Sequence, residues 1–530
     1  MESITTSLVF WALLTPAFFY VAGLLAAFSP KLSPKIMGFL IRQTSYINLL
    51  FSVAASVLVA TKGFLFSPTL GNPSWGFSLR LDPLSVLIWL MISLLAVVIL
   101  RYSVRYLEGD KRHASFLGRM AITFASVQIL VLSGNLGIFL LAWIATSISL
   151  HRLLLFYSER RAARLAAWKK FATARMGDLC IFAAAANLSH HFGTGDLETI
   201  FQAFHQGGSQ VESFGFLGIT GVLFAMAAIL KSAQFPLHGW LVEVMETPTP
   251  VSALLHAGVL NAGPFLVVRM SPIMHEATAA SALLVIVGGF TGWFASTALL
   301  PQPSVKVALG YSSAAHMGFM LMVAGLGVYP AVVLHLVAHS FYKAHAFLSS
   351  GSVVEAARNK SIPLPSRLGS LRRIAGSLGI ALLVYTLFAI IWGVHPLQRP
   401  SLLAVGIILV LGMGQIIAPA LDSKGPRKAT LLACGMAIGV AIAFFSLEAG
   451  AHALLHSVLP ELTTPALPIL FLAAATVLLY QLAVIMQMYL PVMIRTPTLH
   501  AWAIHLRNGL YVNAALDRLA GSLHISKRQS

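Results

Sequence analysis

Long apolar runs dominate the chain, and short segments between them hold most of its charged residues. A transmembrane helix needs roughly 20 mostly apolar residues, so the pattern predicts about fifteen spans. The predicted spans are residues 7–28, 44–62, 83–104, 119–133, 134–156, 171–189, 214–246, 249–270, 278–300, 304–326, 330–354, 374–394, 401–421, 428–450 and 466–490. This pattern indicates an all-α integral membrane protein.

Composition supports the same fold class. The chain has 530 residues, of which 58% are hydrophobic and 10% are charged, and its mean hydropathy is +0.83. A soluble domain has about 25% charged residues, so this chain could not cover its own surface in water. The excess of 35 Lys and Arg over 17 Asp and Glu would suggest nucleic acid in a soluble protein. Here most basic residues lie in loops between spans, so we expect a lipid bilayer and no nucleic acid as partner.

The basic residues also predict an orientation, because cytoplasmic loops retain Lys and Arg. An odd number of spans with the N-terminus periplasmic and the C-terminus cytoplasmic places nearly all loop cations inside. Under this topology the cations of the periplasmic segments are Lys62, Arg80, Arg269 and Arg399. The cations within spans are then Arg152, Lys231 and Lys343.

Cofactor motifs are missing from the sequence. Cys180 and Cys434 lie in apolar runs without a second cysteine or a histidine at metal or haem spacing. The sequence also has no phosphate-binding loop and no dinucleotide fingerprint. We therefore expect neither a cofactor nor a metal in this chain.

The run from 214 to 246 is too long for one straight span. As an unbroken helix it would extend about 50 Å, whereas the hydrocarbon core is about 30 Å thick. Pro236 removes an amide donor and predicts a break within Lys231–Pro236. A break beside an ionisable residue indicates a site, so we expect Lys231 to exchange protons rather than to extend to the headgroups.

Histidines form a second pattern. His335, His339 and Lys343 follow at i, i+4 and i+8, which places them on one helix face. We interpret this stripe as a proton relay, because histidine titrates near physiological pH. Structural hydrogen bonding and metal binding are the alternatives. His256 and His316, in neighbouring spans, extend the predicted path.

Asp178 is a carboxylate inside a predicted span, three residues after Arg175. It either interacts with Lys231 across the bundle or pairs with Arg175 near the helix end. Arg152, near the inner end of its span, either lines an inner mouth of the pathway together with Arg175 or extends to the membrane surface.

Two segments resemble the proton-translocating antiporter-like subunits of respiratory complex I and of Mrp-type antiporters. These segments are residues 228–256, AILKSAQFPLHGWLVEVMETPTPVSALLH, and residues 309–353, LGYSSAAHMGFML through HLVAHSFYKAHAFLSSGSV. The resemblance implies two inverted five-helix repeats with broken helices. It assigns the broken-helix lysine to Lys231, the next-span histidine to His256, and the relay to His335, His339 and Lys343. We expect four parts, residues 1–110, 111–275, 276–425 and 426–530, of which the middle two are the repeats and the last ends in an amphipathic tail.

Departures from that family are informative. Energy-converting members usually have Trp-Glu in the fifth span, where this chain has Trp143-Ile144, and the twelfth span has only His395-Pro396 in place of a lysine. The chain also stops at residue 530 without the long lateral helix of the complex I member. These features and the stretch WIATSISLHRLLLFY are similar to the DabB family, membrane subunits of inorganic-carbon transporters in the bacterial inner membrane.

The DabB resemblance implies a partner, the DabA subunit, a large zinc-containing protein similar to carbonic anhydrase. It implies that the membrane subunit conducts protons or Na+ to drive CO2 hydration by that partner. Two other functions stay open: an ion-pumping subunit of a redox complex or multi-subunit Na+/H+ antiporter, and a scaffold that anchors an enzyme without conducting.

Overall fold

The structure is a computed structural model that describes residues 9–28, 33–205, 214–351, 371–393, 400–422, 427–461, 465–493 and 497–519. Its described residues are mostly helical, with one small antiparallel hairpin. Contacts divide the chain into two units. The first unit comprises Met1–Ala280, His335–Ser349 and Ser457–Pro460, and the second comprises Ser281–Leu334, Ser350–His456 and Glu461–Ser530.

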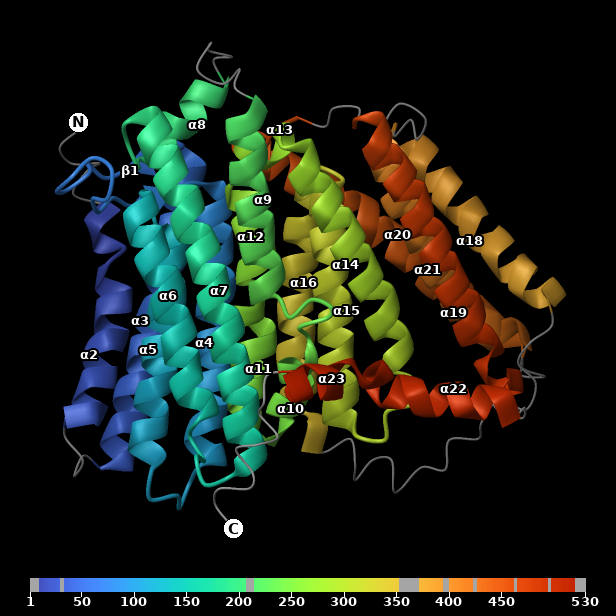
Figure 1. Cartoon of the computed structure of the whole chain (residues 1–530), viewed down its shortest axis with the longest axis horizontal. Helices are drawn as coiled ribbons and strands as arrows, with labels where there is room; N and C mark the ends of the chain where they lie inside the picture. Colours follow the sequence, from blue (N-terminus) through green and yellow to red (C-terminus); the bar gives the residue numbers. More distant parts are fainter. Residues whose placement is uncertain are drawn as a thin grey trace. The chain divides into compact units, whose positions relative to one another are not determined.

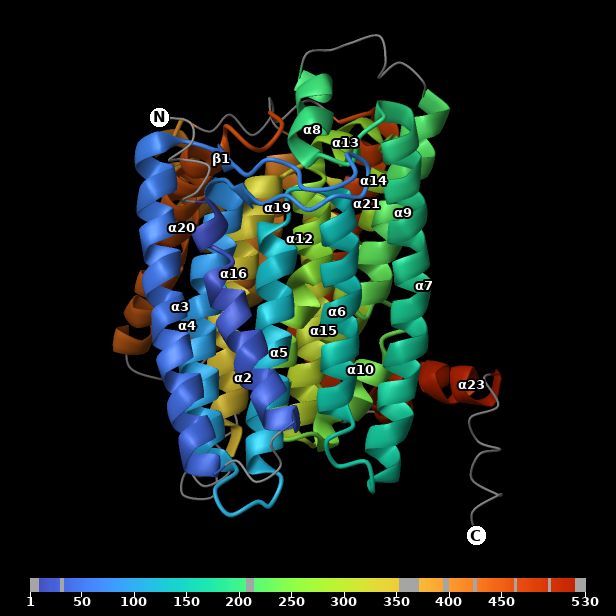
Figure 2. The ribbon, with the colours of Figure 1, turned by 90° about the vertical axis from the view of Figure 1, so that its left-hand side faces the viewer.

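Long helices form most of the first unit, and Figures 1 and 2 show them running side by side. They are α2 (Leu14–Phe28), α3 (Pro34–Lys62), α4 (Pro83–Tyr106), α5 (His113–Leu132), α6 (Leu136–Leu154), α7 (Arg161–Phe192) and α9 (Phe214–Lys231). Helix α5 packs against α2, α4 and α6, and α7 packs against α6 and α9. Helix α6 therefore contacts both α5 and α7.

Shorter helices complete the first unit. They are α8 (Leu197–His205), α10 (Gly239–Glu243), η2 (Val244–Glu246), α11 (Thr249–Ala257), η3 (Val259–Asn261), α12 (Ala262–Arg269) and α13 (Ser271–Glu276). The part of α16 (Tyr329–Leu348) that begins at His335 also belongs to this unit. The pieces α11, η3 and α12 follow one another within a single apolar span, Thr249–Arg269.

The break predicted within the long run is present. Helix α9 ends at Lys231, and the chain becomes helical again at Gly239. Between these residues Ala233 has a left-handed backbone, with φ of 51°, a conformation that is unfavourable for residues with a Cβ atom. Such irregular backbone is tolerated at membrane depth only where protein or water surrounds it.

A buried ion network joins one end of α4 to α12. Asp82 caps α4 by accepting a 2.7 Å hydrogen bond from the amide of Ser85, and it also accepts hydrogen bonds from the guanidinium groups of Arg80 and Arg269. Arg80 lies on β2 (Arg80–Leu81), which pairs with β1 (Leu65–Phe66). Burial alone would raise the pKa of Asp82, but the charges of Arg269 and Arg80 hold it below its usual value.

In the second unit, described helices are α14 (Thr278–Ala298), α15 (Val305–Gly325), α18 (Leu371–Ile391), α19 (Pro400–Asp422), α20 (Arg427–Leu455), α21 (Leu467–Met493), α22 (Pro497–Arg507), η4 (Gly509–Tyr511) and α23 (Val512–Leu519). Helices α18, α19 and α20 share an apolar core that includes Tyr385, Ile417 and Phe445. Each of α18, α19, α20 and α21 is one continuous helix over the residues given above.

The predicted fold class is confirmed. Every predicted span overlaps a helix, and twelve helices among the described residues are long and apolar enough to cross a membrane. Helix boundaries differ from prediction: α3 begins at Pro34 rather than at residue 44, and α7 at Arg161 rather than at residue 171. Basic residues in these first turns hide the helix start from a hydropathy criterion. The four-part division stays a prediction, and His395-Pro396 lies outside the described residues.

Candidate functional site

Lys231 is buried, with 7% of its surface exposed, at the C-terminal end of α9. Its ammonium donates hydrogen bonds to the hydroxyls of Ser147 at 2.7 Å and Thr146 at 3.2 Å, and to the carbonyl of Trp143 at 3.3 Å. It also lies 4.3 Å from the centre of a Trp143 ring, a cation–π distance. The acceptors in these three hydrogen bonds are neutral oxygens.

Helix α6 positions all three acceptors because Trp143, Thr146 and Ser147 follow at i, i+3 and i+4 on one face. Ile144, where the complex I family usually has glutamate, is half-buried on the same helix. Two hydroxyls and a carbonyl therefore hold the lysine, on the helix where complex I members usually have a glutamate.

Lys170 belongs to this site, although the predicted span 171–189 leaves it just outside. It lies within α7 with 4% of its surface exposed, and its ammonium donates a 2.7 Å hydrogen bond to the carbonyl of Ser147. Ser147 thus accepts hydrogen bonds from two lysines through two different oxygens. The signal in the sequence was the spacing of Lys170 and Asp178, which at i and i+8 share one helix face.

Asp178 combines the two predicted alternatives. Its carboxylate forms an ion pair with Arg175 at 2.6 Å, one turn earlier in α7. It also interacts electrostatically with Lys231 and Lys170. Glu448, within α20, is another carboxylate in a predicted span.

The break contacts the irregular span that follows it. The hydroxyl of Ser232 donates to the carbonyl of Leu260 at 3.5 Å, the limit for a hydrogen bond. The next residue, Asn261, donates to the hydroxyl of Ser340 on α16 at 2.7 Å and to the carbonyl of Ala257 at 3.0 Å. The segment from α11 to α12 therefore lies between the break and α16.

The stripe on α16 is arranged as its spacing predicts. The rings of His335 and His339 are stacked with their centres 6.2 Å apart, and Lys343 is fully buried one turn further along. His256, also fully buried, stacks on Phe347 with ring centres 4.4 Å apart and interacts electrostatically with Lys343. His256 and the three stripe residues therefore belong to one part of the first unit.

A half-exposed ion pair fastens the helix that follows the break. The ammonium of Lys169 on α7 lies 2.8 Å from both carboxylate oxygens of Glu243 on α10. Lys169 and Lys170 are neighbours in sequence, yet one pairs with a carboxylate and the other is buried against a carbonyl oxygen.

Two predicted residues lie elsewhere. Arg152 is exposed near the end of α6 and lines a pocket with Arg119. His316 is half-buried on α15 in the second unit. Within the described chain, no group of three or more His, Cys, Asp or Glu side chains is placed to hold a metal.

Sequence reasoning missed Lys170, Ser147 and Asn261. Serine and asparagine are common in membrane helices as packing residues, so only the fold distinguishes those that hold an ionisable partner. The roles of the predicted pathway residues stay predictions, although the fold brings Lys231 and Asp178 together.

Comparisons with known proteins identify the family of this chain. A family model described as NADH:quinone oxidoreductase/Mrp antiporter, TM, matches residues 133–395. A second, described as NADH-Ubiquinone oxidoreductase (complex I), chain 5 N-terminus, matches residues 69–117.

Two individual relatives indicate which branch of this family the chain belongs to. The "Probable inorganic carbon transporter subunit DabB2" of Halothiobacillus neapolitanus is 37% identical over 454 residues, covering 84% of this chain and 80% of that protein. The "Probable inorganic carbon transporter subunit DabB" of Hydrogenovibrio crunogenus is 40% identical over 273 residues, 51% of this chain and 52% of that protein.

A solved structure shares the fold. One chain of the Mrp complex from Dietzia sp. DQ12-45-1b matches 98% of this chain and 60% of its own length, with a TM-score of 0.64 and 21% identity. At that identity the likeness concerns the fold alone. With the relatives above, it shows that this chain belongs to the DabB family of inorganic carbon transporter subunits, multi-pass membrane proteins with the fold of complex I and Mrp antiporter subunits.

Proposed function

We propose that this chain is the membrane subunit of an energy-coupled transporter of CO2 or bicarbonate. It conducts protons or Na+ across the bacterial inner membrane and thereby drives a DabA-like, zinc-binding partner similar to carbonic anhydrase. The zinc chemistry belongs to the partner, and this chain is not itself an enzyme. The names of the relatives support the inorganic-carbon part of the proposal.

The observation that carries the ion-conducting role is the setting of Lys231. Placing an ionisable residue inside a membrane is costly, so such residues usually serve a function. Lys231 is buried beside a helix break, and its hydrogen-bond acceptors are two hydroxyls and a carbonyl. An amine held by neutral oxygens can release and regain a proton without breaking a direct ion pair.

The other polar residues extend the path. Lys170 shares Ser147 with Lys231, and Asp178 acts on both lysines through its charge. On the side of Asn261 away from the break, we assign His256, His335, His339 and Lys343 to the relay. We also assign His316, on α15, to the relay.

Pro236 keeps the backbone at the break from returning to a helix. Arg152 and Arg175 form the cytoplasmic mouth, with the N-terminus periplasmic and the C-terminus cytoplasmic. The clustering of basic residues in alternate loops supports this orientation.

Substitution of Lys231 tests the proposal. We expect Lys231→Ala to abolish partner-dependent uptake of inorganic carbon and growth in air, while the two subunits still co-purify. Lys35→Ala is the matched control, because Lys35 is an exposed lysine at the start of α3. Uptake by Lys231→Ala at the level of Lys35→Ala would overturn the coupling role.

The fold also fits a second function, an ion-pumping subunit of a redox complex or a multi-subunit Na+/H+ antiporter, because the Mrp complex shares it. The proteins that co-purify with a tagged chain separate the two. One large zinc-containing partner supports carbon transport, whereas several hydrophobic or flavin-containing partners support the alternative. Uncoupler-sensitive ion flux through the purified complex would exclude a non-conducting scaffold.

A further inference from the structure

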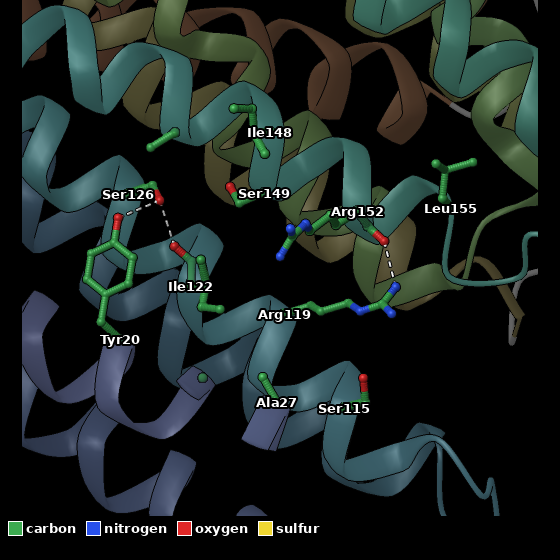
Figure 3. A pocket seen from close by; sticks show the side chains of 12 residues that line it. Tyr20, Ala27, Ser115, Arg119, Ile122, Ser126, Ile148, Ser149, Arg152 and Leu155 are labelled. Carbon is green, nitrogen blue, oxygen red and sulfur yellow. Dashed lines mark hydrogen bonds between the residues drawn. The ribbon is translucent and has the colours of Figure 1, made fainter. Parts of the chain in front are cut away.

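A pocket of about 680 Å³ opens between α2, α5 and α6, away from the residues that hold Lys231. Figure 3 shows it from close by. Its lining residues are Tyr20, Gly23, Ala27, Ser115, Arg119, Ile122, Ser126, Ala145, Ile148, Ser149, Arg152 and Leu155. Of its lining residues, the proposed ion path uses Arg152 alone, at the cytoplasmic mouth.

Apolar side chains and four hydroxyl groups line most of its wall, and two arginines lie towards one end. On α6, Ala145, Ile148 and Arg152 are spaced so that they share one face. Ala145 and Arg152 are about 10 Å apart along the helix axis. Towards the other end, the hydroxyls of Tyr20 and Ser126 are hydrogen-bonded to each other at 2.9 Å.

Two guanidinium groups occupy the cationic end. Arg119 donates a 2.8 Å hydrogen bond to the carbonyl of Arg152 and lies 5.6 Å from the ring centre of Phe156. Figure 3 shows the side chains of Arg119 and Arg152 crossing between α5 and α6 in opposite directions.

Within the described part of the chain, no acidic side chain pairs with either of these two charges. Of the described residues that line the pocket, none is acidic. The guanidinium of Arg152 forms no hydrogen bond or ion pair within the described residues, and it is exposed. The site therefore offers two cations to an anion from outside the chain.

The surroundings indicate what carries that anion. Ile148 in the pocket and Leu141 one turn beyond Ala145 are exposed on α6, and Leu24 is exposed on α2. Exposed apolar side chains on membrane-spanning helices face acyl chains. The pocket thus joins two arginines to a surface that faces lipid.

We propose that this pocket binds the phosphate headgroup of an anionic phospholipid. Guanidinium groups match phosphate in geometry and charge, and basic pockets between membrane helices on the cytoplasmic side are suited to anionic headgroups. One acyl chain lies along Ile122 and Ile148. A free anion such as phosphate or bicarbonate would make no favourable contact with the apolar side chains of the wall.

The lipid site and the Lys231 site lie on opposite faces of α6. Ser149 and Arg152 face the pocket, whereas Thr146 and Ser147 of the same helix hold Lys231. A bound phospholipid fills the space between α2 and α6 and supports the helix on the side opposite the lysine.

Native mass spectrometry of the full chain tests the proposal, with dioleoyl phosphatidylglycerol and phosphatidylcholine as probes. We expect selective retention of phosphatidylglycerol. Arg119→Gln and Arg152→Gln should each lower the affinity for phosphatidylglycerol about fivefold, the effect expected for one cation near a lipid phosphate. Arg105→Gln is the matched control, because Arg105 is exposed in the last turn of α4 and does not line the pocket.

A second variant tests the pocket without changing its charge. Ala27→Trp should fill the pocket and displace phosphatidylglycerol, and thermal unfolding in detergent should show that it folds. Equal retention of the two lipids, or equal retention by Arg152→Gln and Arg105→Gln, would overturn the proposal. Displacement of phosphatidylglycerol by millimolar phosphate or bicarbonate would also overturn it, in favour of a free-anion site.

Discussion

The ammonium of Lys231 and the hydroxyl of Ser147 are joined by a 2.7 Å hydrogen bond. The bond fastens the end of α9 to α6 at the helix break. Since Ser147 also accepts from Lys170 through its carbonyl, one residue of α6 is in contact with two buried ammonium groups. A change at Ser147 should therefore affect both the stability and the ion path.

We expect Ser147→Ala to lower the free energy of unfolding by about 1.5–3 kcal/mol, the range for a hydrogen bond to a charged group. Chemical denaturation in detergent measures this loss, and partner-dependent carbon uptake should fall with it. Ser103→Ala is the control, since Ser103 is buried on α4 and its hydroxyl donates a hydrogen bond to the carbonyl of Ile99 in its own helix. Equal losses of unfolding free energy and of carbon uptake in the two variants would show that the hydrogen bond to Lys231 contributes no more than an ordinary hydrogen bond within a helix.

Asp82 gives a prediction about stability rather than transport. Asp82→Asn should lower the free energy of unfolding by about 3–5 kcal/mol, because it leaves Arg80 and Arg269 buried without their shared anion. Asp110→Asn is the control, since Asp110 is half-exposed in a loop, where it accepts hydrogen bonds from Arg112 and Tyr157. That substitution should cost at most about 1 kcal/mol.

The same carboxylate predicts a dependence on pH. The pKa of Asp82 is lower in the folded protein than in the unfolded chain, so the unfolded chain binds more protons as the solution is acidified. The stability that Asp82 provides is fully present above about pH 5, where even the unfolded carboxyl is ionised. It is lost as the pH falls towards the folded-state pKa. The difference in unfolding free energy between wild type and Asp82→Asn should thus be constant above pH 5 and shrink below pH 4, and a constant difference down to pH 3 would contradict this.

The sequence predicts the helical fold well because apolar runs of membrane length leave few alternatives. It also locates the break, since Pro236 and the excessive length of residues 214–246 point to the same place. The helix starts of α3 and α7 are less predictable. Lys35, Arg42 and Lys170 lie within these helices, and a hydropathy criterion counts such residues as loop.

The site is predicted in part. Spacing alone puts His335, His339 and Lys343 on one face, because these residues share a helix. Spacing cannot show that Lys170 and Lys231 meet at Ser147, since three different helices supply them. Contacts between distant segments depend on how helices pack, which a single sequence does not encode in a local pattern.

Asn261 offers a test of the connection between the break and α16. Asn261→Leu keeps the approximate shape of the side chain but leaves the hydroxyl of Ser340 without its donor. We expect a loss of about 1–3 kcal/mol in unfolding free energy and a fall in carbon uptake. Asn187→Leu is the matched control, because Asn187 bonds Thr220 between α7 and α9, away from α16. Uptake that falls equally in both variants would argue against a path through Asn261.

Lys169 and Lys170 are adjacent in sequence, and their substitution by methionine should have opposite effects on stability. Lys169→Met removes the partner of Glu243, so the unfolding free energy should fall by about 0.5–1 kcal/mol. Lys170→Met replaces a buried ammonium group with an apolar side chain of similar length. Stability should then be unchanged or higher, because the desolvation cost of the ammonium is gone.

Carbon uptake should fall more in Lys170→Met than in Lys169→Met, although Lys169→Met is the less stable variant. If Lys170 acts with Lys231 on the ion path, Lys170→Met should reduce carbon uptake to the level seen without the partner, while Lys169→Met retains most of it. Denaturation and uptake measured on the same preparations separate the two effects. A Lys170→Met variant that is stable and fully active would remove Lys170 from the path, whereas one that is stable and inactive would show that this buried lysine is kept for function at a cost in stability.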